Sequence, residues 1–508
     1  MKRSTQFKAR NVLVGCSAIL SLVLTSCAVG PNYQRPKVDA PTAYRGVNGA
    51  AQQASMADLA WWEVFKDDTL KGLIKTALTN NYDMAAAVAR VEQEQQMVAE
   101  ARSQFFPQIN YNTVLTGGKN QFQFAPSSNT NGVQGFLAAL AQASWEIDLW
   151  GRIRRSTEAA RAQLLATEEA KRGVMLTIMS DVSQAYFNNL GLKLQLAIAT
   201  KNAQTFTASR KLFQDRLEGG VSSMLPVARA TADESTASAQ IPELQRQIAL
   251  TENEISVLLG KNPGPIETQA TLISETLPPE VPAGLPSALL ERRPDVLAAE
   301  ATVHAASAEI GVATAAFFPQ VGLTAFGGKI GTPLSAITSG YTNAWSVGTQ
   351  ITGPIFEGGK LRAQKRQAVA AWQQATAQYK QAALSAFQDV SNALISREQY
   401  EAIRVEQAKA VEANQTSINL ANKRYMQGLS SYYEVLNAEE QMYPSEVQLA
   451  QTETNQRLVI VQLYKALGGG WNLTDQQWTT ASAQTGASNP ATGQKALSAR
   501  NGAPSAAH

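Results

Sequence analysis

The chain has 508 residues, of which 17% are charged and 7% are aromatic, and it contains only two cysteines and two histidines. Its mean hydropathy of −0.19 argues against a polytopic α-helical membrane protein, which needs several apolar stretches of about twenty residues. The few cysteines and histidines leave zinc sites, disulfide frameworks and thiol catalysis with almost no side chains to use.

Residues 1–26 have the pattern of a bacterial lipoprotein signal peptide, with a basic start, an apolar core from Val12 to Leu24 and a cleavage box that ends at Cys27. We expect Cys27 to carry an N-terminal diacylglycerol and an N-acyl lipid such as palmitate, and Ala28 to favour sorting to the outer membrane. Cleavage removes four basic residues and changes the formal charge from +3 to −1, so we infer no nucleic-acid partner. A plain transmembrane anchor is the alternative, but about a dozen apolar residues are short for that role.

The rest of the chain contains a duplication. Residues 105–109 return as 317–321 at an offset of 212, and later matches, such as Gly151 with Gly359 and Arg216 with Arg424, have an offset of 208. This period is too long for a solenoid and indicates two domain-sized repeats. We assign the repeats and the segments around them as follows: an N-terminal segment 27–70, repeat 1 over 71–260, a proline-rich linker 261–293, repeat 2 over 294–468, and a largely disordered tail 469–508.

Each repeat contains an almost uncharged stretch. Phe105 to Trp145 has the single charge Lys119, and Ile310 to Phe356 has the single charge Lys329. Apolar and polar residues alternate in both, which predicts one β-hairpin at about 107–150 and another at about 319–356, each with one apolar face. This pattern is typical of a transmembrane β-barrel. A soluble antiparallel sheet is the alternative, but it has no need to exclude charge.

Helices are predicted on both sides of each hairpin. One precedes each hairpin, at 81–104 and 294–316. A very long one follows it, at 152–218 and 360–427, and a return helix comes next, at 223–259 and 431–467. At 1.5 Å per residue each long helix reaches about 100 Å.

The turns between the long and return helices contain Gly219, Gly220 and Gly428. A left-handed glycine cap is expected there, and Ser223 and Ser431 can cap the return helices.

Two hairpins supply four strands, which are too few to close a barrel. Because an open sheet edge is not tolerated in lipid, the protein must form an oligomer. Two chains would supply eight strands and three would supply twelve.

Several motifs resemble those of TolC-type outer-membrane factors, and most closely the lipoprotein branch that works with resistance-nodulation-division efflux pumps. The resemblance covers about residues 27–470. Its motifs are Cys27-Ala28-Val29-Gly30-Pro31-Asn32-Tyr33, Trp61-Trp62, Glu291-Arg292-Arg293-Pro294-Asp295-Val296, the two Phe-Phe-Pro-Gln elements and Pro354-Ile355-Phe356-Glu357-Gly358-Gly359.

The resemblance implies a membrane α+β fold. Three identical chains would form a 12-strand transmembrane β-barrel, four strands per chain, continuous with a long periplasmic α-helical barrel. The linker and the terminal segments, including the lipid-anchored residues 27–70, would form an equatorial belt. The implied function is a passive exit duct in the Gram-negative outer membrane for drugs or other toxic small molecules. It would dock to a periplasmic adaptor and an inner-membrane pump, and its only bound group would be the lipid on Cys27.

The resemblance also implies a gate at the helix tips. Tyr425 and Glu434 match the positions of a gate tyrosine and a gate carboxylate, and Arg424 lies beside them. Three copies of Glu434 near the axis would attract cations and narrow the bore. Ordinary helix-end capping and surface charge are the alternative roles for these residues.

Three positions depart from the family pattern. Asn437 stands where an aspartate is common, Pro226 is the counterpart of Glu434 in repeat 1, and Ser430 replaces a lock arginine. These differences predict a less charged gate.

No enzyme motif is present: the sequence lacks a phosphate-binding loop, a nucleophile elbow and a metal-binding cluster, and His304 stands alone in an alanine-rich helix. Two alternatives of another class remain, a lipid-anchored periplasmic coiled-coil adaptor and an autolysin or polysaccharide-binding lipoprotein. Within the channel class, a duct for type I protein secretion is the alternative to small-molecule efflux.

Overall fold

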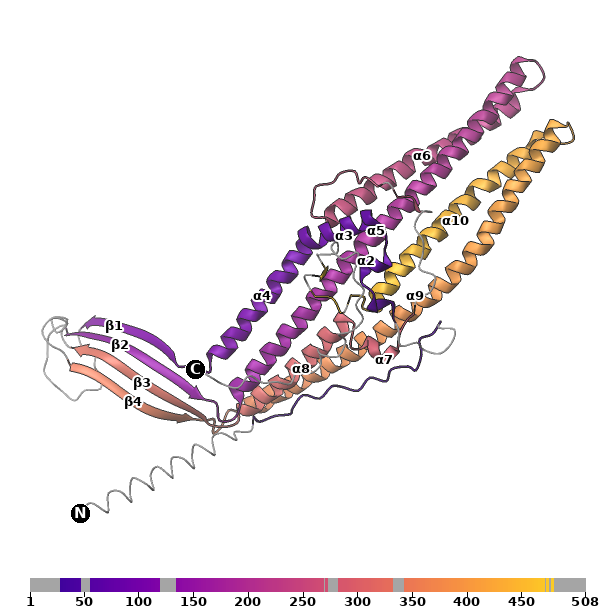
Figure 1. Cartoon of the computed structure of the whole chain (residues 1–508). Coiled ribbons are helices and arrows are strands. Elements are labelled where there is room, and N and C mark those ends of the chain that lie inside the picture. Colours follow the sequence, from indigo (N-terminus) through magenta and orange to yellow (C-terminus); the bar gives the residue numbers. More distant parts are fainter. Residues whose placement is uncertain are drawn as a thin grey trace, which may run out of the picture.

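The chain forms an elongated molecule with a β-sheet at one end and two long helical hairpins that reach the other end (Figure 1). The computed structural model describes residues 28–46, 55–118, 134–268, 270–272, 282–331, 342–470, 472–474 and 477–478. The predicted signal peptide, Cys27 and the tail from residue 479 lie outside the described residues.

Four antiparallel strands form one sheet in the order β1-β2-β3-β4. They are β1 (Gln108–Gly118), β2 (Gln134–Ile147), β3 (Gln320–Gly331) and β4 (Thr342–Thr352). Each repeat supplies one hairpin, and β2 pairs with β3 to join the repeats. The register places Ile109 opposite Ala143 and Ala143 opposite Ala325, so the apolar residues predicted from the alternation share one face of the sheet.

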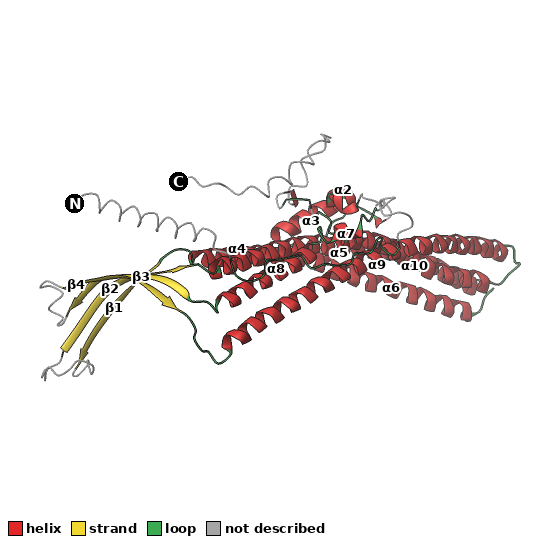
Figure 2. Cartoon of the chain, turned by 90° about the horizontal axis from the view of Figure 1, so that it is seen from below, coloured by secondary structure: helices red, strands yellow, loops and turns green. Residues whose placement is uncertain are grey.

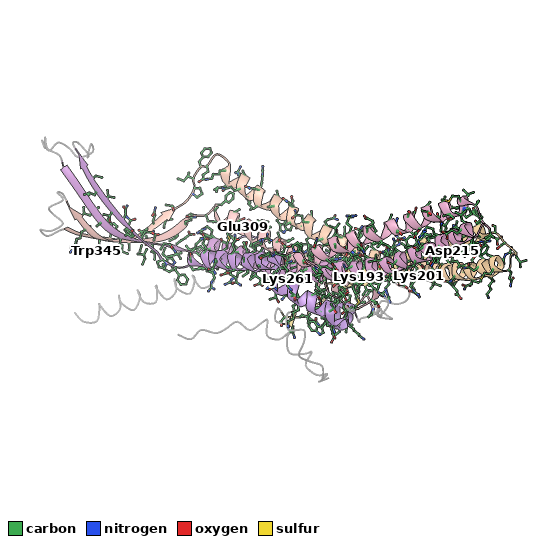
Figure 3. All side chains as sticks on the ribbon, turned by 90° about the horizontal axis from the view of Figure 1, so that it is seen from above. Lys193, Lys201, Asp215, Lys261, Glu309 and Trp345 are labelled. Carbon is green, nitrogen blue, oxygen red and sulfur yellow. The ribbon has the colours of Figure 1, made fainter. Side chains whose placement is uncertain are left out.

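This apolar face is open in the single chain. Tyr111 is 88% exposed and Trp345 is 77% exposed, and Figure 3 shows Trp345 on the sheet, far from Asp215 near the helix tips. Exposed aromatic residues also lie where the strands meet the helices, among them Phe106 and Phe356. A contiguous exposed apolar surface of this kind marks contact with lipid or protein.

Six helices build the two hairpins and the helices that continue them. They are α4 (Tyr82–Ser103), α5 (Arg152–Glu218), α6 (Met224–Leu258), α8 (Pro294–Ala315), α9 (Lys360–Met426) and α10 (Tyr432–Ala466). Helices α4 and α6 pack along α5, and α8 and α10 pack along both α9 and α5. In the described part of the chain, no helix combines the length and the hydrophobicity needed to cross a membrane.

The helix tips turn through glycine. Gly220 and Gly428 have φ of +71° and +74°, as predicted for a left-handed cap. The N–H of Val221 bonds the carbonyl oxygen of Arg216 at 3.0 Å, which is the long bond of a Schellman turn. Ser223 and Ser431 occupy the N-cap positions of α6 and α10, as predicted, but their side chains make no capping hydrogen bond. At Ser431 the carbonyl oxygen accepts from the N–H of Glu434 instead.

Short elements cover one face of the helical layer near its middle (Figure 2). They are η1 (Met56–Asp58), α2 (Trp61–Val64), α3 (Asp68–Asn80) and α7 (Pro286–Leu289). Trp61 and Leu70 are fully buried there, and the hydroxyl of Tyr186 on α5 donates to Asp67. The predicted boundary between residues 70 and 71 falls inside α3, because Asp67 caps that helix.

The Arg-Arg-Pro-Asp motif is a structural clamp. Arg293 is buried and forms two hydrogen bonds with Asp295, of 2.9 and 2.7 Å. It also reaches Asp389 on α9 at 2.9 Å and the carbonyl oxygen of Ala466 on α10 at 3.2 Å. One guanidinium therefore ties the start of α8 to both helices of the second hairpin.

Candidate functional site

The turns of the two helical hairpins lie at the end of the molecule opposite the sheet (Figure 1). One turn contains Gly219 and Gly220 and the other contains Gly428. The residues predicted to form a gate lie beside the second turn.

Tyr425 connects the two hairpins. The guanidinium of Arg216, at the end of α5, donates a hydrogen bond to the Tyr425 hydroxyl and lies 5.6 Å from the ring centroid. The Tyr425 ring packs edge-on against Tyr432, with centroids 5.2 Å apart. A hydrogen bond and a cation–π contact therefore hold the repeats together at the tips, and the aromatic contact joins the two helices of the second hairpin.

Arg424 and Glu434 form an ion pair within their own hairpin. Arg424 Nε lies 3.3 Å from Glu434 Oε2, and both side chains are about half exposed. An exposed pair of this kind contributes less than about 1 kcal/mol. Asn437 is exposed on the next turn of α10. A ring of Glu434 carboxylates around a channel axis stays a prediction.

A buried polar cluster lies next to these residues, and none of its members was predicted as a site residue from the sequence. Tyr432 Oη is 2.6 Å from Ser209 Oγ on α5 and 3.4 Å from Glu439 Oε2 on α10. Glu439 is only 8% exposed, and this burial raises the pKa of its carboxyl to about 7. The ring of Phe213 closes the cluster, 4.4 Å from that of Tyr432.

Helical spacing contains the signal that could have identified Glu439. The residue lies four positions after Val435 and three before Met442, both of which are buried. Residues at these spacings share one helix face, so Glu439 is a carboxylate on a core-facing stripe.

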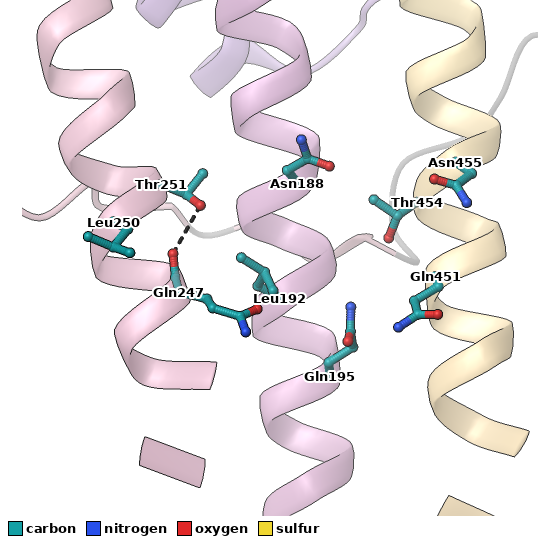
Figure 4. A pocket seen from close by; sticks show the side chains of 9 residues that line it. All are labelled: Asn188, Leu192, Gln195, Gln247, Leu250, Thr251, Gln451, Thr454 and Asn455. Carbon is teal, nitrogen blue, oxygen red and sulfur yellow. Dashed lines mark hydrogen bonds between the residues drawn. The ribbon is translucent and has the colours of Figure 1, made fainter. Parts of the chain in front are cut away.

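A polar pocket of about 510 Å³ opens between α5, α6 and α10 (Figure 4). Amide and hydroxyl groups dominate its lining, which also includes two leucines and contains no charged residue: Asn188, Leu192, Gln195, Gln247, Leu250, Thr251, Gln451, Thr454 and Asn455.

The pocket lies on the side of α5 that faces away from α3. Tyr186 on α5 bonds Asp67, next to the start of α3, and Asn188 follows Tyr186 by two residues, a rotation of about 200° around the helix. Asn188 is exposed there. The short elements and the pocket therefore occupy opposite faces of the helical layer.

In the described ranges, no group of three or more His, Cys, Asp or Glu side chains could hold a metal ion. His304 is not isolated: its Nε2 lies 3.0 Å from Glu158, and its ring stacks on that of Tyr33 with centroids 4.3 Å apart.

Comparison with known proteins agrees with this architecture. A family model described as outer membrane efflux protein matches residues 73–261 and 285–469, one match for each repeat. The probable efflux pump outer membrane protein TtgC of Pseudomonas putida is 32% identical over 480 residues, which cover 92% of this chain and 98% of TtgC.

Solved structures have the same fold. The outer-membrane channel OprN is 30% identical, with a TM-score of 0.81, and the match covers 88% of this chain and 100% of that chain. The open state of the MtrE channel of Neisseria gonorrhoeae is 29% identical, with a TM-score of 0.78, and the match covers 88% and 99%. These relatives are channels and not enzymes, which confirms the expectation that this chain is not an enzyme and excludes the autolysin and adaptor alternatives. The chain belongs to the outer membrane efflux protein family.

Proposed function

We propose that three copies of this chain form the outer-membrane exit duct of a tripartite efflux system. The duct conducts drugs or other toxic small molecules passively from a periplasmic adaptor and a resistance-nodulation-division inner-membrane pump to the cell exterior. The observation that carries this proposal is a four-stranded sheet with two open edges, continuous with two long helical hairpins.

The open edges argue for a ring. Backbone groups at the edges of β1 and β4 need partners in lipid, and three chains of four strands supply twelve. A barrel of about eight strands is filled by its own side chains, whereas a larger one can enclose a passage. The lipid on Cys27 would hold each chain at the outer membrane, with the helices in the periplasm.

The helical layer supports a polar passage. If α2, α3 and α7 form the outer belt, the opposite face, which carries the amide-lined pocket, faces the axis. Uncharged amides offer hydrogen bonds to solutes of either charge without a strong electrostatic well, and this suits a duct that serves many compounds. The Arg216–Tyr425 contact and the cluster around Glu439 would keep the tips of the hairpins closed.

The proposal is tested by deletion and by electrophoresis. Deletion of the gene should increase susceptibility to several unrelated toxic compounds, and the intact gene should restore resistance. The protein solubilised in detergent should migrate as a trimer that heat converts to monomers. A monomer before heating would contradict the duct. Loss of a secreted protein with unchanged susceptibility would favour type I secretion instead.

A further inference from the structure

The pocket between α5, α6 and α10 contains hydrogen-bonding groups that the fold does not use. Five of its nine lining residues have amide side chains, and these come from all three helices (Figure 4). Gln247 donates its amide N–H to Glu243 at 2.7 Å. The other four amides make no hydrogen bond within the described part of the chain: Asn188, Gln195, Gln451 and Asn455. Each of them offers one acceptor oxygen and two donor hydrogens to a bound molecule.

The pocket has the size of a small-molecule site and a mixed lining. Its volume of about 510 Å³ lies within the range of about 300 to 1,000 Å³ that is typical of ligand pockets. Leu192 on α5 and Leu250 on α6 add apolar surface beside the amides. Gly191 allows α10 to come close to α5, because a Cβ at this position would lie 2.3 Å from Thr454 Oγ1. This close packing brings the amides of both helices to one pocket.

The charged residues that adjoin the lining in sequence have partners of their own. Lys193 on α5 pairs with Glu252 on α6 at 3.3 Å, and Arg246 forms an ion pair of 2.6 Å with the residue three positions before it. Glu453 on α10 interacts electrostatically with Arg404 on α9. A charged molecule would lose water in this pocket without meeting an opposite charge in the lining, which is unfavourable. The lining therefore favours uncharged molecules.

We propose that the pocket binds uncharged polar molecules that combine amide or hydroxyl groups with an apolar part. The inference rests on the proposed duct, which brings the pocket to the channel axis, and it specifies the class of molecule that binds there. Carbonyl oxygens of the molecule accept from the amide nitrogens of the lining, and its N–H or O–H groups donate to the amide oxygens. Its apolar part contacts Leu192 and Leu250. Three chains supply three such sites at one level of the duct.

The open form of the pocket limits the affinity. Asn188, Leu250 and Gln451 are exposed in the single chain, and an exposed group that exchanges water for another partner gains little free energy. We expect dissociation constants of about 1 mM or more. Weak binding suits a duct, because a molecule that enters the site must also leave it.

Ion current through the full-length protein in planar bilayers tests this site. The probes are three peptides with one skeleton: the neutral N-acetyl-leucyl-leucinamide, the cationic leucyl-leucinamide and the anionic N-acetyl-leucyl-leucine. At about pH 6 the α-amino and α-carboxyl groups of the last two are ionised. The neutral peptide should reduce the current at millimolar concentration, and each charged peptide should need at least about fivefold more. Equal block by all three peptides, or no block by the neutral one, would overturn the proposal.

Substitution of two lining amides assigns the block to the pocket. Asn188→Ala with Gln451→Ala should raise the half-blocking concentration of the neutral peptide at least about fivefold, because two hydrogen-bonding groups are removed. The matched control is Gln245→Ala. Gln245 is an exposed amide on α6, rotated by about 200° from Gln247, and its substitution should leave the block unchanged. An unchanged block in the double variant would overturn the site but not the duct. A full-length protein that forms no trimer and conducts no ions would overturn both.

Photochemical labelling locates the site without any substitution. The neutral peptide with a diazirine in one leucine side chain should label residues within 188–195, 247–251 and 451–455 on irradiation, and the same peptide without the diazirine should compete. Labelling spread evenly along the helices, with no competition, would overturn the site.

Discussion

Replacing Glu439 with glutamine tests how the buried cluster at the helix tips responds to pH. The carboxyl of Glu439 faces Tyr432 on its own helix and Ser209 on α5. Burial raises the pKa of Tyr432, and Asp233 on α6, the other acidic group that acts on this cluster, adds a smaller rise. No cation is among the groups that shift the pKa of Glu439, so its ionisation is opposed mainly by burial.

The size of the effect follows from the pKa. Burial raises the pKa of Glu439 from 4.5 to about 7, and each unit corresponds to about 1.4 kcal/mol. Ionisation therefore costs the packed tip about 2 to 3 kcal/mol. In the unfolded chain the carboxyl of Glu439 has its ordinary pKa of 4.5, and in the folded tip its pKa is about 7. The free energy of unfolding therefore falls as pH rises between these two pKa values and is constant above the higher one.

Hydrogen exchange of backbone amides in α10 near residue 439 measures this stability locally. Between about pH 5 and about pH 8, the wild-type opening free energy should fall by about 2 kcal/mol, roughly a 30-fold loss of protection after correction for intrinsic rates. Glu439→Gln should abolish the change, whereas Glu440→Gln, at the exposed neighbouring position, should keep it. A Glu439→Gln variant with the wild-type pH response would refute the reasoning.

Three further substitutions test the tips and the packing between hairpins. Arg216→Leu removes the donor and the cation that hold Tyr425, so the closed tip should lose about 1 to 2 kcal/mol and conductance in planar bilayers should rise. Unchanged conductance would show that this contact does not restrain the tip. Glu434→Ala should reduce cation selectivity, and an unaltered selectivity removes Glu434 from the gate. Gly191→Ala places a Cβ 2.3 Å from Thr454 Oγ1, so we expect a loss of about 1 to 3 kcal/mol, measured as a lower dissociation temperature. Thr454→Ala in the same chain should restore it, and failure to do so would assign the loss to another contact.

Local features of this protein could be predicted from the sequence. The exclusion of charge from 105–145 and the alternation within it predict strands, because each depends only on neighbouring residues and on the period of two. The left-handed turns at Gly220 and Gly428 follow in the same way, since only glycine adopts that conformation without steric cost.

Contacts between distant residues could not be predicted in this way. The sequence identifies Arg216 as the counterpart of Arg424 in the other repeat. It does not predict that Arg216 contacts Tyr425, which lies 209 positions away. Glu434 was predicted to lie near a channel axis, and its ion pair with Arg424 in its own hairpin was not predicted. Which of several nearby charges form a pair depends on the angle between helices, and no local pattern encodes that angle.

The sequence by itself determined the duplication, the hairpins, the long helices and the glycine turns, because these arise from composition, periodicity and backbone sterics within a few residues. Tertiary structure alone decided which side chains meet across the repeats. It buried Glu439 beside Tyr432, made Arg293 a clamp between three helices and placed the amide pocket opposite the short helices. Burial and pairing are properties of packed surfaces, so they exist only once distant segments come together.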